Sequence, residues 1–425
     1  MAAGAQFLSS LQQALKVSEL RSKLLFTVAM LLVFRIGAHI PVPGVNPDAI
    51  ARLIESGALF GFFDVISGGA FKNFSVFAMG IIPYINASII MQLLTVVIPA
   101  LERLSKEGEE GRKKIVQYTR YGTAILAFLQ AIGMSVALRG SLVNPGIWTY
   151  LFVAIVLTAG TVFLMWLGEQ ITERGIGNGI SLLIFAGIVS RVPAGFVRTV
   201  DYLQAGTINI LSVVGLIIIG GLVIAAVVAV QEGQRRIPVQ YAKRVVGRRV
   251  YGGQTTHLPL RVNQAGVIPV IFASSLLMFP EQIARYFPGN VVADTFLRFF
   301  QWGTFLHTLF YALLIIGFTY FYTAVIMNPN DVADNIKKYG GFIPGLRPGR
   351  PTAEYISRVM ARITLAGAIF LALIAILPNF VLLATRIPNI YFGGTALLIV
   401  VGVALETMKQ VEAHLLMRSY QGFIK

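Results

Sequence analysis

Two nine-residue segments of this chain nearly repeat each other: GIIPYINAS at residues 80–88 and GVIPVIFAS at residues 266–274. A second pair, GISLLIFAG at 179–187 and GTALLIVVG at 394–402, is similar but weaker. The two offsets are 186 and 215 residues, close to half of the 425-residue chain. Each segment opens a long apolar run, and the first pair interrupts it with glycine and proline. Two related halves with interrupted helices at matching places are typical of membrane transport proteins.

The composition indicates a membrane protein. Apolar residues make up 56% of the chain and charged residues 13%, whereas about a quarter of the residues in a soluble protein are charged. The absence of cysteine excludes disulfides and cysteine-ligated metals. The N-terminal stretch lacks the small-residue cleavage site of a secretory signal, so internal segments are expected to cross the membrane.

A membrane-spanning helix needs about 20 apolar residues, and the chain offers ten such runs. They lie at 24–40, 74–98, 116–138, 148–168, 179–199, 209–230, 265–284, 304–327, 362–384 and 392–408. Five precede about residue 205 and five follow it. Because five is odd, the second half has to lie upside down relative to the first. The sequence therefore predicts an all-α polytopic membrane protein whose halves, 1–205 and 206–425, form an inverted repeat.

The distribution of basic residues predicts the orientation in the membrane. With the N-terminus in the cytosol, the cytosolic segments and span ends hold 26 of the 35 Lys and Arg residues, and the opposite side holds nine. Short cytosolic loops are enriched in Lys and Arg. A multi-pass protein with both termini in the cytosol is therefore expected.

The stretch 60–72 (FGFFDVISGGAFK) is apolar but too short to span a membrane. Gly68 and Gly69 weaken it as a helix. It lies between the first two spans on the outer side, either as a re-entrant half-helix or as an amphipathic helix at the interface. The residues alone favour neither alternative.

Two cytosolic loops, 231–264 and 328–360, are longer than their connections require. The first holds seven Lys and Arg residues against a single acid, and alternation between Val245 and Tyr251 predicts a small hairpin. The second contains GGFIPGLRPGRPT, which predicts a stiff, exposed turn. Their charge suits orientation in the membrane, attraction to anionic lipids, docking of a cytosolic partner, and contact with RNA phosphates.

The chain lacks the signatures of catalysis and cofactor binding. No Gly-Lys dipeptide occurs, which excludes a Walker phosphate loop, and the four histidines are scattered without metal-ligand spacing. No Asp or Glu lies deep in a predicted span, where ion-coupled transporters carry ionisable groups. We therefore expect no enzymatic activity and no cofactor, and we expect a partner to supply the energy for any transport.

Nine strings distributed along the chain carry a resemblance to a known family. They are FRIGAHIPVPGV, GIIPYINASIIMQLL, QYTRYGT, FLMWLGEQITERGIGNGIS, GQRRIPVQYAKR, TTHLPLRVN, GVIPVIFASS, MNPNDVADNIKK and YFGGTALLIVV. Through these strings the chain resembles, over essentially its full length, the SecY family, the central subunits of bacterial Sec protein-conducting channels.

The resemblance implies a channel that passes unfolded preproteins across the cytoplasmic (inner) membrane and releases apolar segments sideways into lipid. It implies two small membrane subunits, SecE and SecG, and two cytosolic partners that drive transport, the SecA ATPase and the ribosome. The ribosome would contact the basic loops through its RNA. Preprotein signal sequences are the expected ligands of the channel.

The resemblance also places an apolar collar at the narrowest point of the pore. Its members are Ile81, Ile85, Ile180, Ile184, Ile271 and Ile399. The repeat supports part of this set, because Ile85 aligns with Ile271 and Ile184 aligns with Ile399. A narrow aliphatic ring dewets when no peptide fills it, so ions cross it poorly. Most isoleucines in a membrane span face lipid or a neighbouring helix; the repeat and the resemblance distinguish these six.

Three further sets of residues follow from the resemblance. The plug, which blocks the closed channel from the outer side, corresponds to Phe62, Phe63, Asp64, Val65, Ile66, Ser67, Gly68 and Gly69. A lateral gate between the second and seventh spans corresponds to Asn86, Ile90, Gln92, Gln130, Ser274 and Met278. The docking site for the motor and the ribosome corresponds to Arg235, Arg236, Lys243, Arg244, Arg248, Arg249, Arg347 and Arg350.

Two local expectations accompany these sets. The glycine and proline of GIIPYIN and GVIPVIF are expected to let the second and seventh spans bend. Arg347 lies in the turn GLRPG without an adjacent acid, so its charge is free to pair with a partner's carboxylate or phosphate. The family carries a functionally essential arginine at this position.

Other classes of protein explain the sequence less well. A five-plus-five secondary transporter should carry a charged or oxygen-rich site at the midplane, and the spans lack one. A passive scaffold for ribosome attachment leaves the interrupted helices and aligned isoleucines unexplained. An intramembrane protease is excluded, because the spans contain no paired aspartates and no His-Glu motif.

Overall fold

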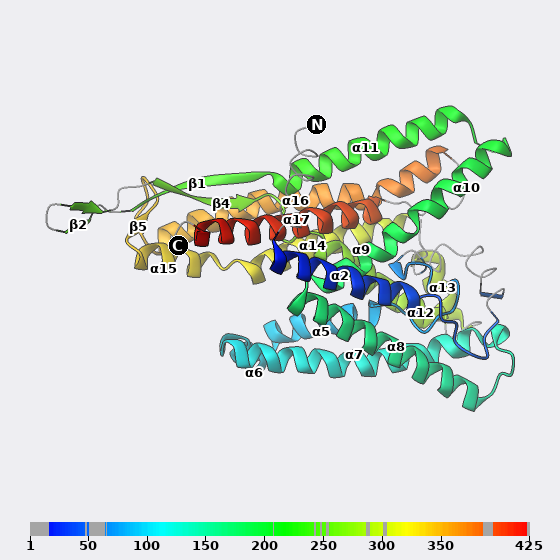
Figure 1. The fold of residues 1–425 in the computed structure, drawn as a ribbon. Helices are drawn as coiled ribbons and strands as arrows, with labels where there is room; N and C mark the ends of the chain where they lie inside the picture. Colours follow the sequence, from blue (N-terminus) through cyan, green and yellow to red (C-terminus); the bar gives the residue numbers. More distant parts are fainter. Residues whose placement is uncertain are drawn as a thin grey trace.

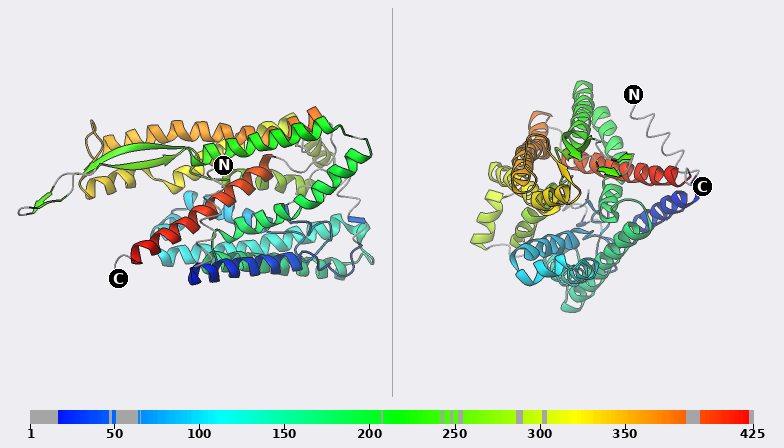
Figure 2. Two further views of the ribbon diagram at one scale, coloured as in Figure 1. Left: turned by 45° about the horizontal axis from the view of Figure 1, so that its top comes forward. Right: turned by 90° about the vertical axis from the view of Figure 1, so that its left-hand side faces the viewer.

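The computed structural model describes residues 17–46, 49–50, 64, 66–206, 208–241, 244–246, 249–251, 255–285, 290–300, 304–385 and 394–422. The helices lie along roughly one direction in an elongated bundle, and a β arm projects beyond one end of it (Figure 1). We call this end the arm end. Seen along the bundle, the helices from the first part of the chain group on one side and most of those from the second part on the other (Figure 2, right).

Helices account for most of the described chain. In the first half they are α2 (Ser18–Gly37), α5 (Ile82–Val97), α6 (Pro99–Lys106), α7 (Glu109–Ala137), α8 (Ile147–Arg174), α9 (Gly179–Ser190) and α10 (Val192–Gln204). In the second half they are α11 (Ile210–Glu232), α12 (Ile268–Arg285), α13 (Val291–Phe300), α14 (Phe305–Ile326), α15 (Pro329–Lys338), α16 (Arg350–Thr385) and α17 (Gly394–Gly422). Each of the ten predicted spans overlaps one of these helices.

Not every helix is long enough to cross a membrane by itself. Five helical stretches meet the length and apolarity of a span among the described residues, or six if α5 and α6, which meet at a bend of 100°, count as one. The longest helix, α16, has 36 residues and is about 54 Å long at 1.5 Å per residue. Because this exceeds the bilayer core of about 30 Å, one of its ends extends beyond the membrane.

The predicted span at 74–98 begins too early. Residues 74–81 form turns, and α5 begins at Ile82. The segment is apolar because it is buried: Phe74 is 1% exposed and Ala78 is fully buried. Its backbone leaves helical geometry at Gly80, which has φ of 57°, a left-handed conformation that glycine adopts without strain.

The glycine and proline of the two repeats lie at the starts of helices and do not bend a helix in its middle. Gly80 and Gly266 both have positive φ and stand just before α5 and α12, and Pro83 and Pro269 lie at the second position of these helices. Proline fits the first turn of a helix because its missing N–H has no partner there anyway. These residues therefore start the helices. The break after α5 lies at Ile98 instead.

All four repeat segments of the sequence begin a helix. The weaker pair starts α9 at Gly179 and α17 at Gly394. At α9 the Asn178 side chain caps the first turn by accepting hydrogen bonds from the backbone N–H groups of Ile180 and Ser181, at 3.1 and 3.2 Å. The repeated feature is thus the start of a helix in the interior of the protein.

The β arm follows α11. Strands β1 (Gln234–Tyr241) and β4 (Thr255–Arg261) pair in antiparallel register from Gln234–Arg261 to Gln240–Thr255, and β5 (Gly341–Phe342) joins β1. Strands β2 (Arg244–Val246) and β3 (Arg249–Tyr251) form the predicted hairpin at the tip. Ile237 and Val239 of β1 pack in one apolar cluster with Ile356 of α16, which attaches the arm to the bundle.

The largest apolar core joins the two halves. It contains buried residues of α5, α8, α9, α11, α12, α14, α16 and α17. A second core lies beside it and contains Ile82 of α5, Ala127 of α7, Leu157 of α8 and Met278 of α12. The halves 1–205 and 206–425 therefore share hydrophobic cores across their boundary.

Candidate pore and gate

The structure brings the predicted collar isoleucines together. Ile81, Ile85, Ile184, Ile271 and Ile399 are between 2% and 8% exposed and belong to one apolar cluster, and the partly buried Ile180 packs against it. Ile81 directly precedes α5, and the other five lie within the first six residues of α5, α9, α12 or α17. The four repeat segments thus converge, and the beginnings of their helices supply one aliphatic cluster that belongs to both halves.

Ile180 has a second contact that sets it apart. A Cβ added to Gly168 of α8 would lie 2.5 Å from the Ile180 Cδ1 atom, so the side chain packs directly on the glycine. α8 and α9 belong to the same half. Ile180 is therefore held in part by its own half.

The described part of the predicted plug packs beside this cluster. Ile66 lies against the cluster and Ala70 is fully buried in it. Gly187 of α9 faces this segment so closely that an added Cβ would lie 2.4 Å from the Ile66 carbonyl oxygen. The described residues of this segment are therefore packed inside the protein. Phe62, Phe63 and Val65 lie outside the described residues.

Two arginines hold this segment. Arg191, between α9 and α10, forms an ion pair with Asp64, whose side chain is 1% exposed. Arg35 of α2 donates a hydrogen bond to the Gly68 carbonyl oxygen at 2.5 Å and another to Ser190 Oγ at 3.2 Å. Sequence reasoning assigned Asp64 only as part of the plug and neither arginine to any site. An arginine within an apolar span, as Arg35 is, was the available signal.

The predicted lateral gate residues lie along α5, α7 and α12. Asn86, Gln130, Ser274 and Met278 are buried, Gln92 is partly buried, and Ile90 is 44% exposed. Helix α5 packs against α12, mainly through apolar side chains of the two cores. The Ser274 hydroxyl donates to the Ile271 carbonyl of its own helix at 2.9 Å, so it does not bridge the two helices.

Met278 of the expected gate shares a core with Ile82 at the start of α5. Ile90 lies eight residues further along α5, which is about 12 Å at 1.5 Å per residue. The structure thus relates Met278 to the start of α5, and a pairing of Ile90 or a close neighbour with Ser274–Met278 stays a prediction.

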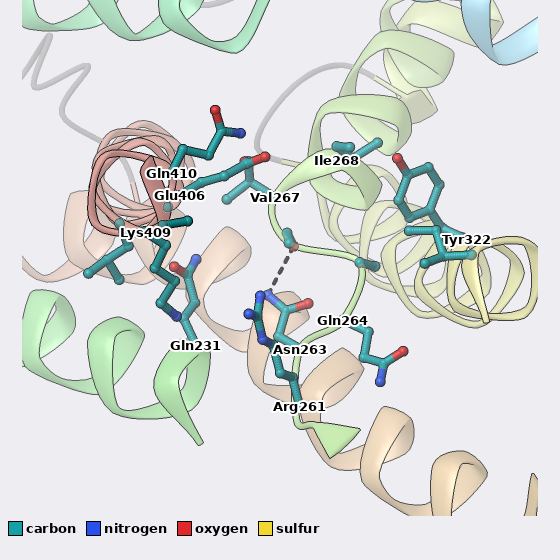
Figure 3. A pocket seen from close by; sticks show the side chains of 16 residues that line it. Gln231, Arg261, Asn263, Gln264, Val267, Ile268, Tyr322, Glu406, Lys409 and Gln410 are labelled. Carbon is teal, nitrogen blue, oxygen red and sulfur yellow. Dashed lines mark hydrogen bonds between the residues drawn. The ribbon is translucent and has the colours of Figure 1, made fainter. Parts of the chain in front are cut away.

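A polar cavity of about 410 Å³ opens near the arm end, where α11 ends and α12 begins. Figure 3 shows amide and charged side chains around it, from α11, α17 and the segment that joins β4 to α12. Arg261 and Lys409 provide positive charge and Glu406 provides negative charge. Val267 and Ile268 also line the cavity, so it lies close to Ile271 of the apolar cluster.

The predicted docking residues occupy the arm and a neighbouring turn. Arg235 and Arg236 are exposed on β1, Arg347 is exposed between β5 and α16, and Arg350 is exposed at the start of α16. Arg350 forms an i,i+4 ion pair with Glu354 at 3.2 Å. Arg244 and Arg249 lie on the hairpin strands, and the remaining two predicted residues, Lys243 and Arg248, lie outside the described residues.

Surface charge near the arm end also includes α6. There Lys106 donates a hydrogen bond to the Glu102 carboxylate at 2.7 Å, and this contact lowers the pKa of the carboxyl. In the described part of the chain, no three His, Asp or Glu side chains gather as ligands of a metal ion would.

Comparison with known proteins places this arrangement in a class and then in a family. The fold is shared with a solved structure described as "The structure of a protein conducting channel", with a TM-score of 0.67 and 21% identity over 92% of each chain. It is shared as well with a SecY structure whose plug domain is described as stabilising the closed state, with a TM-score of 0.66. A Sec61 channel from a canine ribosome-channel complex gives 0.63 at 20% identity. The fold is thus that of protein-conducting membrane channels.

Sequence relatives identify the family. A sequence model of the SecY family matches residues 75–408. The protein translocase subunit SecY of Halalkalibacterium halodurans is 52% identical over 422 residues, covering 96% of this chain and 98% of the relative. The corresponding subunit of Escherichia coli K12 is 49% identical over 420 residues, covering 96% and 95%. The chain belongs to the SecY family.

Proposed function

We propose that this chain is the pore-forming subunit of a protein translocase in the cytoplasmic membrane. It conducts unfolded preproteins across the bilayer and releases apolar segments sideways into lipid. The observation that carries the proposal is the convergence of the collar isoleucines, from four helix starts and both halves, in one buried cluster. Family membership at 52% identity over nearly the full chain supports the same conclusion.

The collar seals the resting channel. Aliphatic side chains offer neither charge nor hydrogen bonds to water or ions, so a narrow ring of them dewets. The same chemistry lets a polypeptide pass without a strong binding site. The segment that contains Asp64 and Ile66–Gly69 acts as the plug and closes the channel on the outer side. The plug domain of a SecY structure of this fold is described as stabilising the closed state and maintaining a membrane seal.

The two halves are an inverted repeat with ten spans, and both termini are cytosolic. The arm end is then the cytosolic end, and the polar cavity near it forms part of the entrance. Its charged and amide side chains suit a hydrated peptide before it reaches the apolar collar. Separation of α5 from α12 provides the sideways exit, because these helices belong to different halves and meet through apolar side chains.

The partners of this channel are SecE and SecG in the membrane and SecA and the ribosome in the cytosol. The exposed arginines of β1 and of the turn before α16 provide the docking site. Arginine pairs well with both carboxylates and phosphates, so one surface suits a protein motor and ribosomal RNA. A channel of this fold is described in a ribosome complex.

A small-solute transporter is the alternative function. It is disfavoured because the cluster where the halves converge is aliphatic, whereas a solute site at the midplane is usually built from helix termini and polar groups directed at the solute.

Transport by reconstituted vesicles tests the proposed function. Vesicles that contain this chain, SecE and SecG should import a preprotein when SecA and ATP are added, and the imported chain should become resistant to protease. Vesicles that lack this chain provide the control. Uptake of a small solute without preprotein import would instead support the transporter alternative.

A further inference from the structure

The contacts of the predicted plug suggest how it is held. Asp64 lies almost completely buried beside Arg191, and its Oδ1 accepts a hydrogen bond from the Lys72 backbone N–H at 2.8 Å. The carbonyl oxygen of Asp64 accepts from the Gly69 backbone N–H at 2.8 Å. One residue thus organises the turn internally and attaches it to the end of α9 through an ion pair.

A second attachment involves the opposite side of the turn. Arg35 donates to the Gly68 carbonyl, and Ser190 Oγ lies within hydrogen-bonding distance of both. Arg35 belongs to α2, whereas Ser190 and Arg191 stand at the end of α9. The turn is therefore held by two different helices at the same place.

The charges are unbalanced around Asp64. Arg35 and Arg198 lie close enough to Arg191 for their charges to repel it, so the Asp64 carboxylate pairs with an arginine that has further positive charge beside it. An ion pair excluded from water is retained only when its partners match closely, and removal of one partner leaves an uncompensated charge. Moving the turn away from Arg191 would likewise leave an uncompensated charge.

We propose that Asp64, Arg191 and Arg35 form an electrostatic latch that keeps the plug closed. The three are positioning residues: they set the position of the turn, and the turn adds to the seal that the collar provides. This proposal rests on the proposed function, because it needs segment 64–69 to be the plug. Close packing is also part of the latch. A Cβ added at Gly68 would lie 2.9 Å from Gly187 Cα, so only glycine fits at this position.

Accessibility of the plug gives the direct test. The chain contains no cysteine, so a single Ala70→Cys substitution, at a fully buried position, reports when the turn leaves its site. In channel complexes in membranes, a maleimide that does not cross the bilayer, applied from the side opposite SecA, should react slowly. Adding Asp64→Asn or Arg191→Gln should accelerate labelling about tenfold or more and raise resting ion conductance.

Three controls make the result decisive. Arg191→Lys keeps the positive charge, so Ala70→Cys should be labelled almost as slowly as in the parent. If Arg191 acted only through packing, the Lys and Gln variants should be labelled equally fast. Arg139→Gln removes an exposed arginine elsewhere on the predicted outer side and should change nothing. Combining Asp64→Asn with Arg191→Gln should raise labelling by less than the product of the two single effects.

A variant of the collar distinguishes failure of the latch proposal from failure of the proposed pore. Replacing Ile85, Ile184, Ile271 and Ile399 with Ser should raise resting conductance whether or not the latch exists. If that variant conducts while the Asp64 and Arg191 variants label and conduct like the parent, the latch is wrong and the pore stands. If the collar variant is also silent, the proposed pore is wrong.

Discussion

The two halves meet along two seams that differ in chemistry. At the gate seam, α5 packs against α12 through apolar side chains such as Ile89, Ile271 and Met278. At the hinge seam, α9 packs against α17, and the loop between α8 and α9 adds a directional contact: the Gly177 N–H donates to Gln410 Oε1 at 2.9 Å. Among the described residues, apolar side chains thus contribute to the gate seam, and the hinge seam includes a hydrogen bond between the two halves.

The hinge seam includes a third helix. The Ile176 N–H donates to Thr27 Oγ1 of α2 at 3.1 Å, and Leu20 of α2 packs in one cluster with Ile176 and Val411. Apolar contacts are non-directional, so the apolar part of the gate seam can separate into lipid without breaking hydrogen bonds. Opening the hinge seam would break hydrogen bonds, each worth about 1 kcal/mol. We therefore propose that the gate seam is the one that opens.

Covalent locking of each seam should give the largest difference between them. We expect a disulfide between cysteines at Ile82 and Met278, which share a core, to stop preprotein transport, because α5 could no longer leave α12. Reduction should restore transport. The matched pair, Ile176 and Val411 at the hinge seam, should leave transport nearly unchanged when oxidised. Equal effects of the two disulfides, each verified by mobility on a gel, would remove the distinction.

A charge reversal away from both seams should have a smaller but still strong effect. Arg347→Glu should reduce SecA-driven transport about tenfold or more, since loss of a charged contact in an interface costs about 2–5 kcal/mol. Insertion and assembly of the complex should remain normal. Arg350→Glu is the neighbouring control, because Arg350 already pairs with Glu354 and should contribute less. Full transport by the Arg347 variant would make Arg347 an ordinary surface charge.

Much of the fold could be predicted because membrane spans and repeats are local patterns. The alignment of Ile85 with Ile271 and of Ile184 with Ile399 depends on the sequence alone, and these four residues lie in one cluster. The hairpin of β2 and β3 was likewise predicted from alternation within a few residues. Such patterns can be recognised in a sequence because residues of one helix or strand follow one regular backbone geometry.

The sequence could not locate helix starts or long-range polar contacts. Residues 74–81 are apolar because they are buried turns, and composition does not distinguish a buried turn from a membrane helix. The ion pair of Asp64 with Arg191 joins residues 127 positions apart, and nothing local to either residue identifies the other.

Resting conductance of the collar variant tests the central claim most directly. The parent complex, reconstituted in a planar bilayer without a preprotein, should be nearly silent, and the variant with Ser at positions 85, 184, 271 and 399 should conduct ions continuously, because hydroxyl groups hydrate the constriction. Four Ile→Ser changes at exposed apolar positions, such as Ile125, Ile155, Ile217 and Ile369, provide the control and should stay silent. A conducting collar variant supports a pore sealed by these isoleucines. A collar variant as silent as the parent would contradict the account.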